Sequence, residues 1–542
     1  MGQSAGIAHS AASDITQLRK LLDDQYSDET IFRELAQNAD DAEATWVVVR
    51  YLERGPGGGH PLLEGPAVLI INDGYFRHAD DEAIRRLGAG TKGGDATAIG
   101  KFGLGLKSVF HWCEAFFYLA SVDQQGAGGE PPFCRLFNPW GKLRAEWDGD
   151  HFEKQIVPLV SQTIAGALPS EAAASRWFAL YIPLRRSGQW ASNGGGEASR
   201  SPIRAGEPDV KTLFPSGLPI EIGGLLPLLR HVQRLTFRVP GGAGFVASLE
   251  EKSVRTLGPD GIARQRLGTD RLLSGSAVLE RDGYAPQSLK YQGVEHLAVR
   301  DPVFQQIRQR PDWPKIMAFD AKTEESEDRP EKGEPHGAVI CSWMEPCAAI
   351  PSGLSVREAV FLPLEGGKSA VLPAARVRLI LHGFYFVDAG RRALHRGDDI
   401  QTDWNDSVRR RVTLPLVLPA LARFALTAQF DPATTAQLTE GLDKAFSADP
   451  ADRQALLGEF QWLPRLPSDA NPVPEYGLCA AGEPYFALPK AARNALPFRL
   501  FPRLREAAKR YRPLTIIGTK NIPIWPSFPL PASYGSGADS GA

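Results

Sequence analysis

The sequence predicts an α+β fold in which helices cover a sheet, and three observations lead to this prediction. Apolar residues recur at helical spacing over residues 31–42, which predicts an amphipathic helix. Two stretches rich in β-branched residues, 46–52 and 67–73, have the composition of strands. Further strand-like runs follow over residues 116–122, 132–138 and 176–184. Helices layered on one sheet in this way are typical of an α/β sandwich.

Length and composition place the chain among globular proteins of several domains. Its 542 residues correspond to about three domains at roughly 100–200 residues each. A hydrophobic share of 43% and a charged share of 23% are usual for a soluble globular protein. The net charge of −2 gives no overall basic field, so nucleic acid is not expected as a partner.

Cysteine usage and hydropathy predict a cytoplasmic protein without membrane contact. The five cysteines contain no C-x-x-C pair, and neither they nor the ten histidines have the spacing of a zinc site. No apolar run reaches the ~20 residues of a membrane-spanning helix. The first ten residues lack the apolar segment of a secretory signal, so reduced thiols in a cytosol are expected.

Composition also predicts how the chain divides into domains. Residues 187–218 are rich in Gly, Ser and Pro and are predicted to link a first domain, 1–186, to a second. The second domain, 219–425, alternates apolar stretches with Gly turns and is predicted to be α+β. Residues 426–515 are predicted to be helical, and the tail 516–542 has no core-forming pattern and is predicted to be disordered.

The stretch ELAQNADDA, residues 34–42, carries an acid and an amide at helical spacing. Glu34 and Asn38 are four residues apart, so both side chains project from one face of the predicted helix. A polar pair beside an apolar stripe is also typical of an ordinary solvated helix face.

A second stretch, GKFGLGLKS at residues 100–108, combines three glycines with the start of a predicted helix. Glycine permits close backbone approach, and a helix N-terminus presents N–H groups to an anion. Between the two stretches lies VLIINDG, an apolar strand that ends in Asp73 and Gly74. Taken singly, a strand–helix turn and an Asp-Gly turn are common structural features.

The order of these motifs resembles that of the GHKL ATPases, the group that includes gyrase, histidine kinases and the HSP-ninety chaperones. Within that group the sequences of these motifs are most similar to those of sacsin and its relatives. The resemblance is carried by LRKLLDDQYSDETIFRELAQNADDAEAT and NDGYFRHADDEAIRRLGAGTKGGDATAIGKFGLGLKSVFH, and extends more thinly to about residue 425. It implies a GHKL (Bergerat) α/β sandwich that binds ATP, followed by a middle-type α+β domain and a helical C-terminal region.

The resemblance implies a role for each residue of the first domain's site. Glu34 would be the general base that takes a proton from the attacking water, and Asn38 would bind Mg²⁺. Asp73 would accept a hydrogen bond from the adenine amine, and Asp41 would either shape the pocket or stabilise the helix. The glycine-rich loop would hold the ATP phosphates through Gly100, Lys101, Phe102, Gly103, Leu104 and Gly105.

Two further pairs of residues are implied to reach the phosphates. Thr91 and Lys92 lie in a Gly-rich segment, about 76–99, that matches the family's lid and would approach the nucleotide when the lid closes. Arg391 and Arg392 match the place of a second-domain arginine that contacts the γ-phosphate in HSP-ninety chaperones, and the sequence does not decide between them.

The chain departs from the usual GHKL pattern directly after Asp73. Most GHKL proteins have D-x-G-x-G, whereas this chain has Tyr75 and Arg77 in place of the two glycines. Sacsin relatives also tend to lack these glycines, so the departure is interpreted as variation within the subfamily.

The resemblance implies an ATPase that binds ATP and Mg²⁺ and hydrolyses slowly, driving a chaperone-like cycle on an unidentified protein client. An alternative is an ATP-gated binding module or scaffold, with little hydrolysis, in a larger bacterial stress or antiphage assembly. A DNA-processing clamp of the gyrase or MutL type is disfavoured by the near-neutral charge. Whether ATP binding joins two copies of the chain into a homodimer is left open.

Overall fold

A computed structural model describes much of the chain, and by internal contacts the chain divides into two compact units. Unit 1 is Met1–Glu250, Ala277–Gln287 and Asp388–Arg392, and unit 2 is Glu251–Ser276, Ser288–Val387 and Ala393–Ala542. The described residues are 5–9, 31–58, 61–76, 80–81, 84, 106–121, 133–138, 152–168, 176–186, 208–215, 217–242, 244–256, 269–314, 334–344, 353–360, 362–364, 367–370, 376–387, 393–428, 438, 441–442, 445–446, 448–457, 461–465, 475–479, 513–515 and 525–526.

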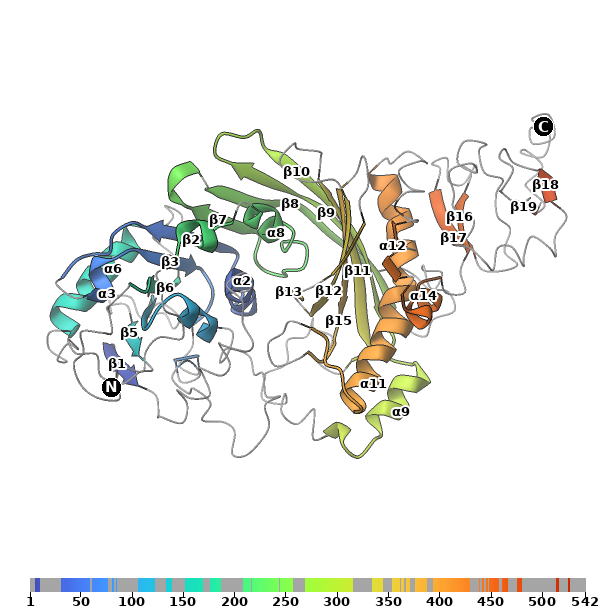
Figure 1. Ribbon diagram of the computed structural model, residues 1–542, viewed down its shortest axis with the longest axis horizontal. Helices are drawn as coiled ribbons and strands as arrows, with labels where there is room; N and C mark the ends of the chain where they lie inside the picture. The colour runs from blue at the N-terminus through green and yellow to red at the C-terminus, as the bar shows by residue number, and fades with distance from the viewer. Residues whose placement is uncertain are drawn as a thin grey trace. The chain divides into compact units, whose positions relative to one another are not determined.

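Unit 1 is built on a mixed sheet with the strand order β1-β5-β4-β6-β3-β2-β7-β8 (Figure 1). The central strand β3 pairs antiparallel with both β2 and β6, while β2 pairs parallel with β7. The strands are β1 (Ala5–His9), β2 (Trp46–Leu52), β3 (Ala67–Asn72), β4 (Phe116–Ala120), β5 (Phe133–Asn138), β6 (Phe178–Pro183), β7 (Arg234–Arg238) and β8 (Phe245–Thr256).

Helices cover both faces of this sheet, which explains why every residue of β3 is buried. The helices are α2 (Ile31–Asp41), α3 (Pro61–Glu64), η2 (Leu106–His111), η3 (Phe152–Ile156), α6 (Val157–Ala165), α7 (Val210–Leu213), α8 (Leu218–Gly223) and η6 (Pro240–Gly242). Val160 of α6 packs in one apolar core with Leu69 of β3. On the opposite face, Phe32 of α2 lies 5.3 Å from Phe237 of β7, measured between ring centroids. The helix predicted over residues 31–42 and the two strands predicted after it therefore form, as α2, β2 and β3.

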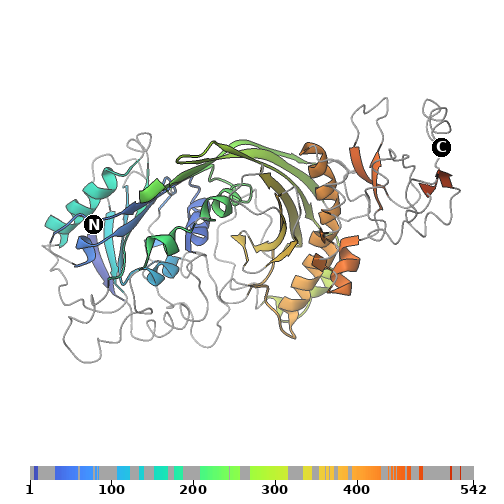
Figure 2. The same cartoon turned by 45° about the horizontal axis from the view of Figure 1, so that its top comes forward.

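Unit 2 contains a second run of strands, in the order β9-β10-β11-β15-β12-β13, with β14 paired to β12. Figure 2 shows the long helix α12 lying along one face of these strands. The strands are β9 (Thr269–Arg281), β10 (Gln287–Leu297), β11 (His336–Met344), β12 (Gly353–Val360), β13 (Leu362–Pro363), β14 (Lys368–Ala370) and β15 (Arg376–Gly383). The helices are α9 (Pro302–Arg308), α11 (Ile400–Ser407), η7 (Val408–Thr413), α12 (Leu414–Thr427) and α14 (Pro450–Leu457).

A glycine lets η7 lie directly on the unit 2 strands. A Cβ atom at Gly337 of β11 would come within 2.6 Å of the Thr413 methyl and 2.9 Å of a Val412 methyl. Any larger residue at this position would therefore push the helix away from the sheet.

The mixed α+β character predicted from sequence is confirmed, but the end of the chain is not uniformly helical. Within 426–515 the strands β16 (Gln461–Arg465) and β17 (Glu475–Cys479) pair antiparallel. Their register places Trp462 opposite Leu478. A second small pair joins β18 (Pro513–Thr515) to β19 (Trp525–Pro526). Among the described residues, no helix has the length and apolar character needed to cross a bilayer.

The core of unit 2 around Trp404 gives a direct test of this packing. Trp404 is fully buried, and its indole N–H donates to the Phe384 carbonyl oxygen at 2.7 Å. Replacing it in Trp404→Phe leaves that buried carbonyl without its donor, which should lower the free energy of unfolding by about 1–3 kcal/mol. Urea unfolding measures the change. The matched control is Val254→Ala, at a position that is 53% exposed, which should change stability by less than about 0.5 kcal/mol. Equal effects of the two substitutions would contradict this account of the core.

Candidate functional site

Helix α2 presents three stripes of side chains that point in different directions. Its apolar stripe consists of Ile31, Phe32, Leu35, Ala36 and Ala39, all buried. A second stripe, spaced i, i+4 and i+7, carries the predicted site residues Glu34, Asn38 and Asp41. A third, spaced i and i+7, carries Arg33 and Asp40. The predicted site residues therefore share one face that is separate from the core.

Glu34 is a buried carboxylate at the start of this helix. Its side chain lies in the first turn of α2 and the residue is only 5% exposed. The N–H groups of the first turn carry partial positive charge, which favours a negative side chain there. Asn38 and Asp41 are partly exposed, so the stripe runs from a buried acid to accessible oxygen atoms.

The turn after β3 is attached to the C-terminal end of α2. The Tyr75 backbone N–H donates to the Ala42 carbonyl oxygen at 2.8 Å. The Asn72 side-chain oxygen accepts the Gly74 N–H at 2.9 Å, which closes the turn. A Cβ atom at Gly74 would lie 2.8 Å from the Ala42 Cβ and 3.0 Å from its carbonyl oxygen. Glycine is therefore required for this close approach of strand end and helix end.

The Asp73 carboxylate is bound by the start of β2. One oxygen, Oδ1, accepts the backbone N–H groups of Thr45 at 2.6 Å and Trp46 at 3.1 Å, and Oδ2 accepts the Thr45 hydroxyl. A carboxylate has about four acceptor positions, so Oδ2 keeps the capacity for one further donor. The side chain is thus fixed in orientation by the protein and can still accept a hydrogen bond from a ligand.

Arg176, just before β6 in the chain, also holds this turn. The Arg176 side chain donates through Nε to the Asp73 carbonyl oxygen at 2.8 Å. Its guanidinium lies 3.7 Å from the centroid of the Tyr75 ring, in cation–π geometry. Tyr75 is therefore held against Arg176 and is 37% exposed.

The start of the predicted lid segment is anchored to the sheet. The buried Asp81 carboxylate accepts the Tyr118 hydroxyl at 2.7 Å and the Arg135 Nε–H at 3.0 Å. Just before it, the ring of Phe76 stacks on Phe178 at a centroid distance of 5.0 Å. The contacts fix where this segment leaves β3.

The segment that leaves the glycine-rich loop is held by a buried arginine. Arg185 donates to the carbonyl oxygens of Phe110, His111 and Cys113 at 2.7, 3.0 and 3.1 Å. It also forms an ion pair with Glu114, and both side chains are 2% exposed. Burial raises the pKa of the Cys113 thiol well above its ordinary value, so this thiol stays neutral beside the pair. Arg185 therefore satisfies the carbonyl groups at the end of η2.

The structure joins the C-terminal end of α2, which carries Asp41, to the turn that carries Asp73, through the contacts at Ala42 and Thr45. Glu34 and Asn38 lie on the same face of this helix, farther from that junction. The remaining predicted residues lie outside the described part of the chain: Thr91, Lys92, Gly100, Lys101, Phe102, Gly103, Leu104, Gly105, Arg391 and Arg392. Their roles remain predictions.

Sequence reasoning missed Arg33, Asp40, Arg176 and Arg185. Arg185 is one of two adjacent arginines after a predicted strand, and nothing in that pattern distinguishes a buried arginine from a surface one. For Asp40, the doubled acid at the end of ELAQNADDA was the available signal, because only one of two adjacent helical residues can belong to the site stripe.

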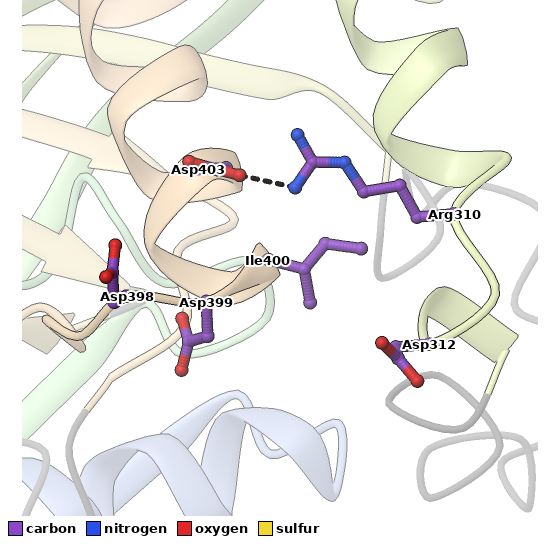
Figure 3. Close-up of a pocket in the computed structure, with 6 residues that line it drawn as sticks. All are labelled: Arg310, Asp312, Asp398, Asp399, Ile400 and Asp403. Atoms are coloured by element: carbon purple, nitrogen blue, oxygen red, sulfur yellow. Dashed lines mark hydrogen bonds and ion pairs between the residues drawn. The ribbon is translucent and has the colours of Figure 1, made fainter.

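A pocket of about 520 Å³ lies in unit 2 (Figure 3). Its described lining residues are Arg310, Asp312, Asp398, Asp399, Ile400 and Asp403. Asp403 forms an ion pair with Arg310. Asp399 caps α11 by accepting the Thr402 N–H at 2.9 Å. These contacts stabilise the fold of unit 2, and none of the lining residues was predicted as functional.

The described residues contain no group of three or more His, Cys, Asp or Glu side chains arranged to hold a metal ion.

Comparisons with known proteins agree with the resemblance over the first part of the chain. Residues 13–123 match the family model described as the Sacsin domain. Human Sacsin (Homo sapiens) is 30% identical over 118 residues, which cover 20% of this chain and 2% of that protein. The B-subunit of the DNA gyrase from Myxococcus xanthus aligns with a TM-score of 0.29 and 10% identity, covering 75% of this chain and 92% of that chain. A TM-score this low supports no argument about the fold.

The buried Arg185 pair predicts a large effect on stability. In Arg185→Met the Glu114 carboxylate stays buried without its cation, which should lower the free energy of unfolding by about 3–5 kcal/mol. The matched control, Arg186→Met, changes an exposed neighbour and should shift stability by less than about 0.5 kcal/mol. Thermal denaturation of both variants measures the difference, and similar melting temperatures would contradict the role assigned to Arg185.

Proposed function

We propose that this chain binds ATP with Mg²⁺ at the polar stripe of α2 and hydrolyses it slowly. Closure and reopening of the site would drive a chaperone-like conformational cycle on a protein client. One observation supports this most: hydrogen bonds at Ala42 and Thr45 join the end of α2 that carries Asp41 to the turn that carries the Asp73 carboxylate. The match to the Sacsin domain, residues 13–123, includes both of these elements and the glycine-rich loop.

In this proposal Asp73 selects the base. Its Oδ2 atom would accept one hydrogen bond from the exocyclic amine of adenine, in addition to the bond from Thr45. Guanine carries a carbonyl oxygen at the equivalent position, which would face a carboxylate without a proton to share. Because Thr45 and Trp46 already hold the Asp73 carboxylate in place, little conformational entropy would be lost in orienting it when the base binds.

The donor atoms of the α2 stripe fit Mg²⁺. Asn38 offers an amide oxygen beside the carboxylates of Glu34 and Asp41, and Mg²⁺ prefers such oxygen ligands, with phosphates and water completing the octahedron. Asn38 would hold the ion, and the bound ion would neutralise the charge on the phosphates. The Glu34 carboxylate would accept the proton of the attacking water.

The phosphates and the lid complete the proposal from residues outside the described part. Gly100 to Gly105 would hold the phosphates, and Thr91 and Lys92 would approach them on closure. Arg391 or Arg392 would stabilise charge on the γ-phosphate. Each of these roles rests on the family resemblance. Arg185 holds the described segment that follows this loop in the chain.

Phosphate release separates an ATPase from an ATP-gated scaffold. The wild type should release phosphate slowly in the presence of Mg²⁺. Glu34→Gln should lower the rate by about 100-fold or more while ATP affinity changes little, because only the proton acceptor is lost. The exposed Glu53→Gln is the control. A wild type that binds ATP and never releases phosphate would contradict the ATPase proposal and favour the scaffold.

Base selectivity tests the place of Asp73. In Asp73→Asn the Thr45 hydroxyl can rotate to accept from the new amide, so the turn should persist. The variant should bind ATP about 10- to 100-fold more weakly, since a hydrogen bond to a charged group contributes roughly 1.5–3 kcal/mol. Its preference for ATP over GTP should shrink in parallel. Calorimetric titration with each nucleotide measures both effects, and an unchanged preference would show that the base binds elsewhere.

A further inference from the structure

The third stripe of α2 is bound by a single segment of unit 1. The Asp40 carboxylate accepts three successive backbone N–H groups, from Arg230 at 2.9 Å, His231 at 2.7 Å and Val232 at 3.0 Å. Asp40 is 6% exposed. Successive N–H groups that converge in this way form a concave anion site, which here is filled by a side chain of the same domain.

A second tie lies two turns earlier on the same stripe. Arg33 Nη2 contacts Glu221 Oε2 of α8 at 2.8 Å, with side-chain exposures of 6% and 29%. Seven residues separate Arg33 from Asp40, which corresponds to roughly 10 Å along the helix axis. Two contacts at that separation, here called ties, fix both the position of α2 along its axis and its rotation about that axis.

The Asp40 contact leads into the strand that follows. Residues 230–232 run directly into β7, and the Gln233 N–H next to them donates to the Thr45 carbonyl oxygen at 2.7 Å. Thr45 is also the residue that binds Asp73. β7 pairs with β2 on one side and β8 on the other. A shift of α2 therefore has to move residues 230–232 or break the bonds to Asp40.

We propose that Asp40 and Arg33 are positioning residues that aim Glu34 and Asn38 at the nucleotide and transmit the occupancy of the site to residues 221–238. This inference rests on the proposed function. The tie stripe and the site stripe lie on different sides of one rigid helix, so any displacement of one displaces the other. Displacements of about 1 Å at a reacting group can cost roughly 100-fold in rate, so such ties control turnover without touching ATP.

Amide hydrogen exchange on the wild-type chain tests the transmission. Addition of a non-hydrolysable ATP analogue with Mg²⁺ should change the exchange rates of Arg230, His231 and Val232 by about tenfold or more, because these amides are bound to a carboxylate on the helix that carries the site. Exchange within β16 and β17 in unit 2 provides an internal reference.

Asp40→Asn tests the positioning role. This substitution keeps the shape of the side chain and removes its charge, so exchange of the three amides should rise even without nucleotide. Turnover should fall by about tenfold, whereas the dissociation constant for ATP should change by less than about threefold, since no contact with ATP is lost. Glu43→Gln, an exposed acid three residues away, is the matched control and should leave exchange and turnover unchanged. Glu221→Gln should reproduce a smaller loss of turnover through the other tie.

The outcomes distinguish this inference from the function on which it rests. If the wild type shows no saturable binding of the analogue, the proposed function and the inference both fail. If the analogue binds and residues 230–232 show no change in exchange, the inference is overturned while ATP binding stands. Unchanged turnover in a folded Asp40→Asn would overturn it equally. Should Asp40→Asn fail to fold, the wild-type exchange measurement decides.

Discussion

The attachment of the Asn72–Tyr75 turn to the end of α2 is the constraint on which the candidate site depends. The Tyr75–Ala42 hydrogen bond and the bonds from Thr45 to Asp73 join a strand end to a helix end. Only a residue without a Cβ fits at Gly74 between them. Because of this junction, the Asp73 carboxylate at the end of β3 is held at a fixed position relative to the polar stripe of α2.

The same helix serves three purposes because its stripes point in different directions. The apolar stripe buries Phe32 against Phe237, which holds α2 on the sheet. The polar stripe keeps accessible oxygens beside a buried acid, and the third stripe ties the helix to residues 221–232. Asp40 and Asp41 are adjacent in the chain and belong to different stripes. Asp40 therefore binds residues 230–232, while Asp41 lies among the predicted site residues.

The helix and the two strands around the site could be predicted from sequence, because spacing and β-branched composition are local signals. The contacts that hold them could not. Asp40 binds backbone groups 190 to 192 residues away, and Arg185 binds carbonyls 72 to 75 residues away. Such partners follow from tertiary packing and leave no pattern in the sequence. The helical prediction for 426–515 was wrong for β16 and β17, which pair antiparallel and contain the poor helix formers Pro464 and Gly477.

A crystal structure with Mg²⁺ and a non-hydrolysable ATP analogue would show whether the nucleotide binds at α2 and β3. We expect adenine at Asp73, with its amine on Oδ2, and the ion bound by Asn38 with Glu34 facing the terminal phosphate. A nucleotide bound away from α2 and β3 would exclude this site, as would crystals that stay empty at saturating analogue.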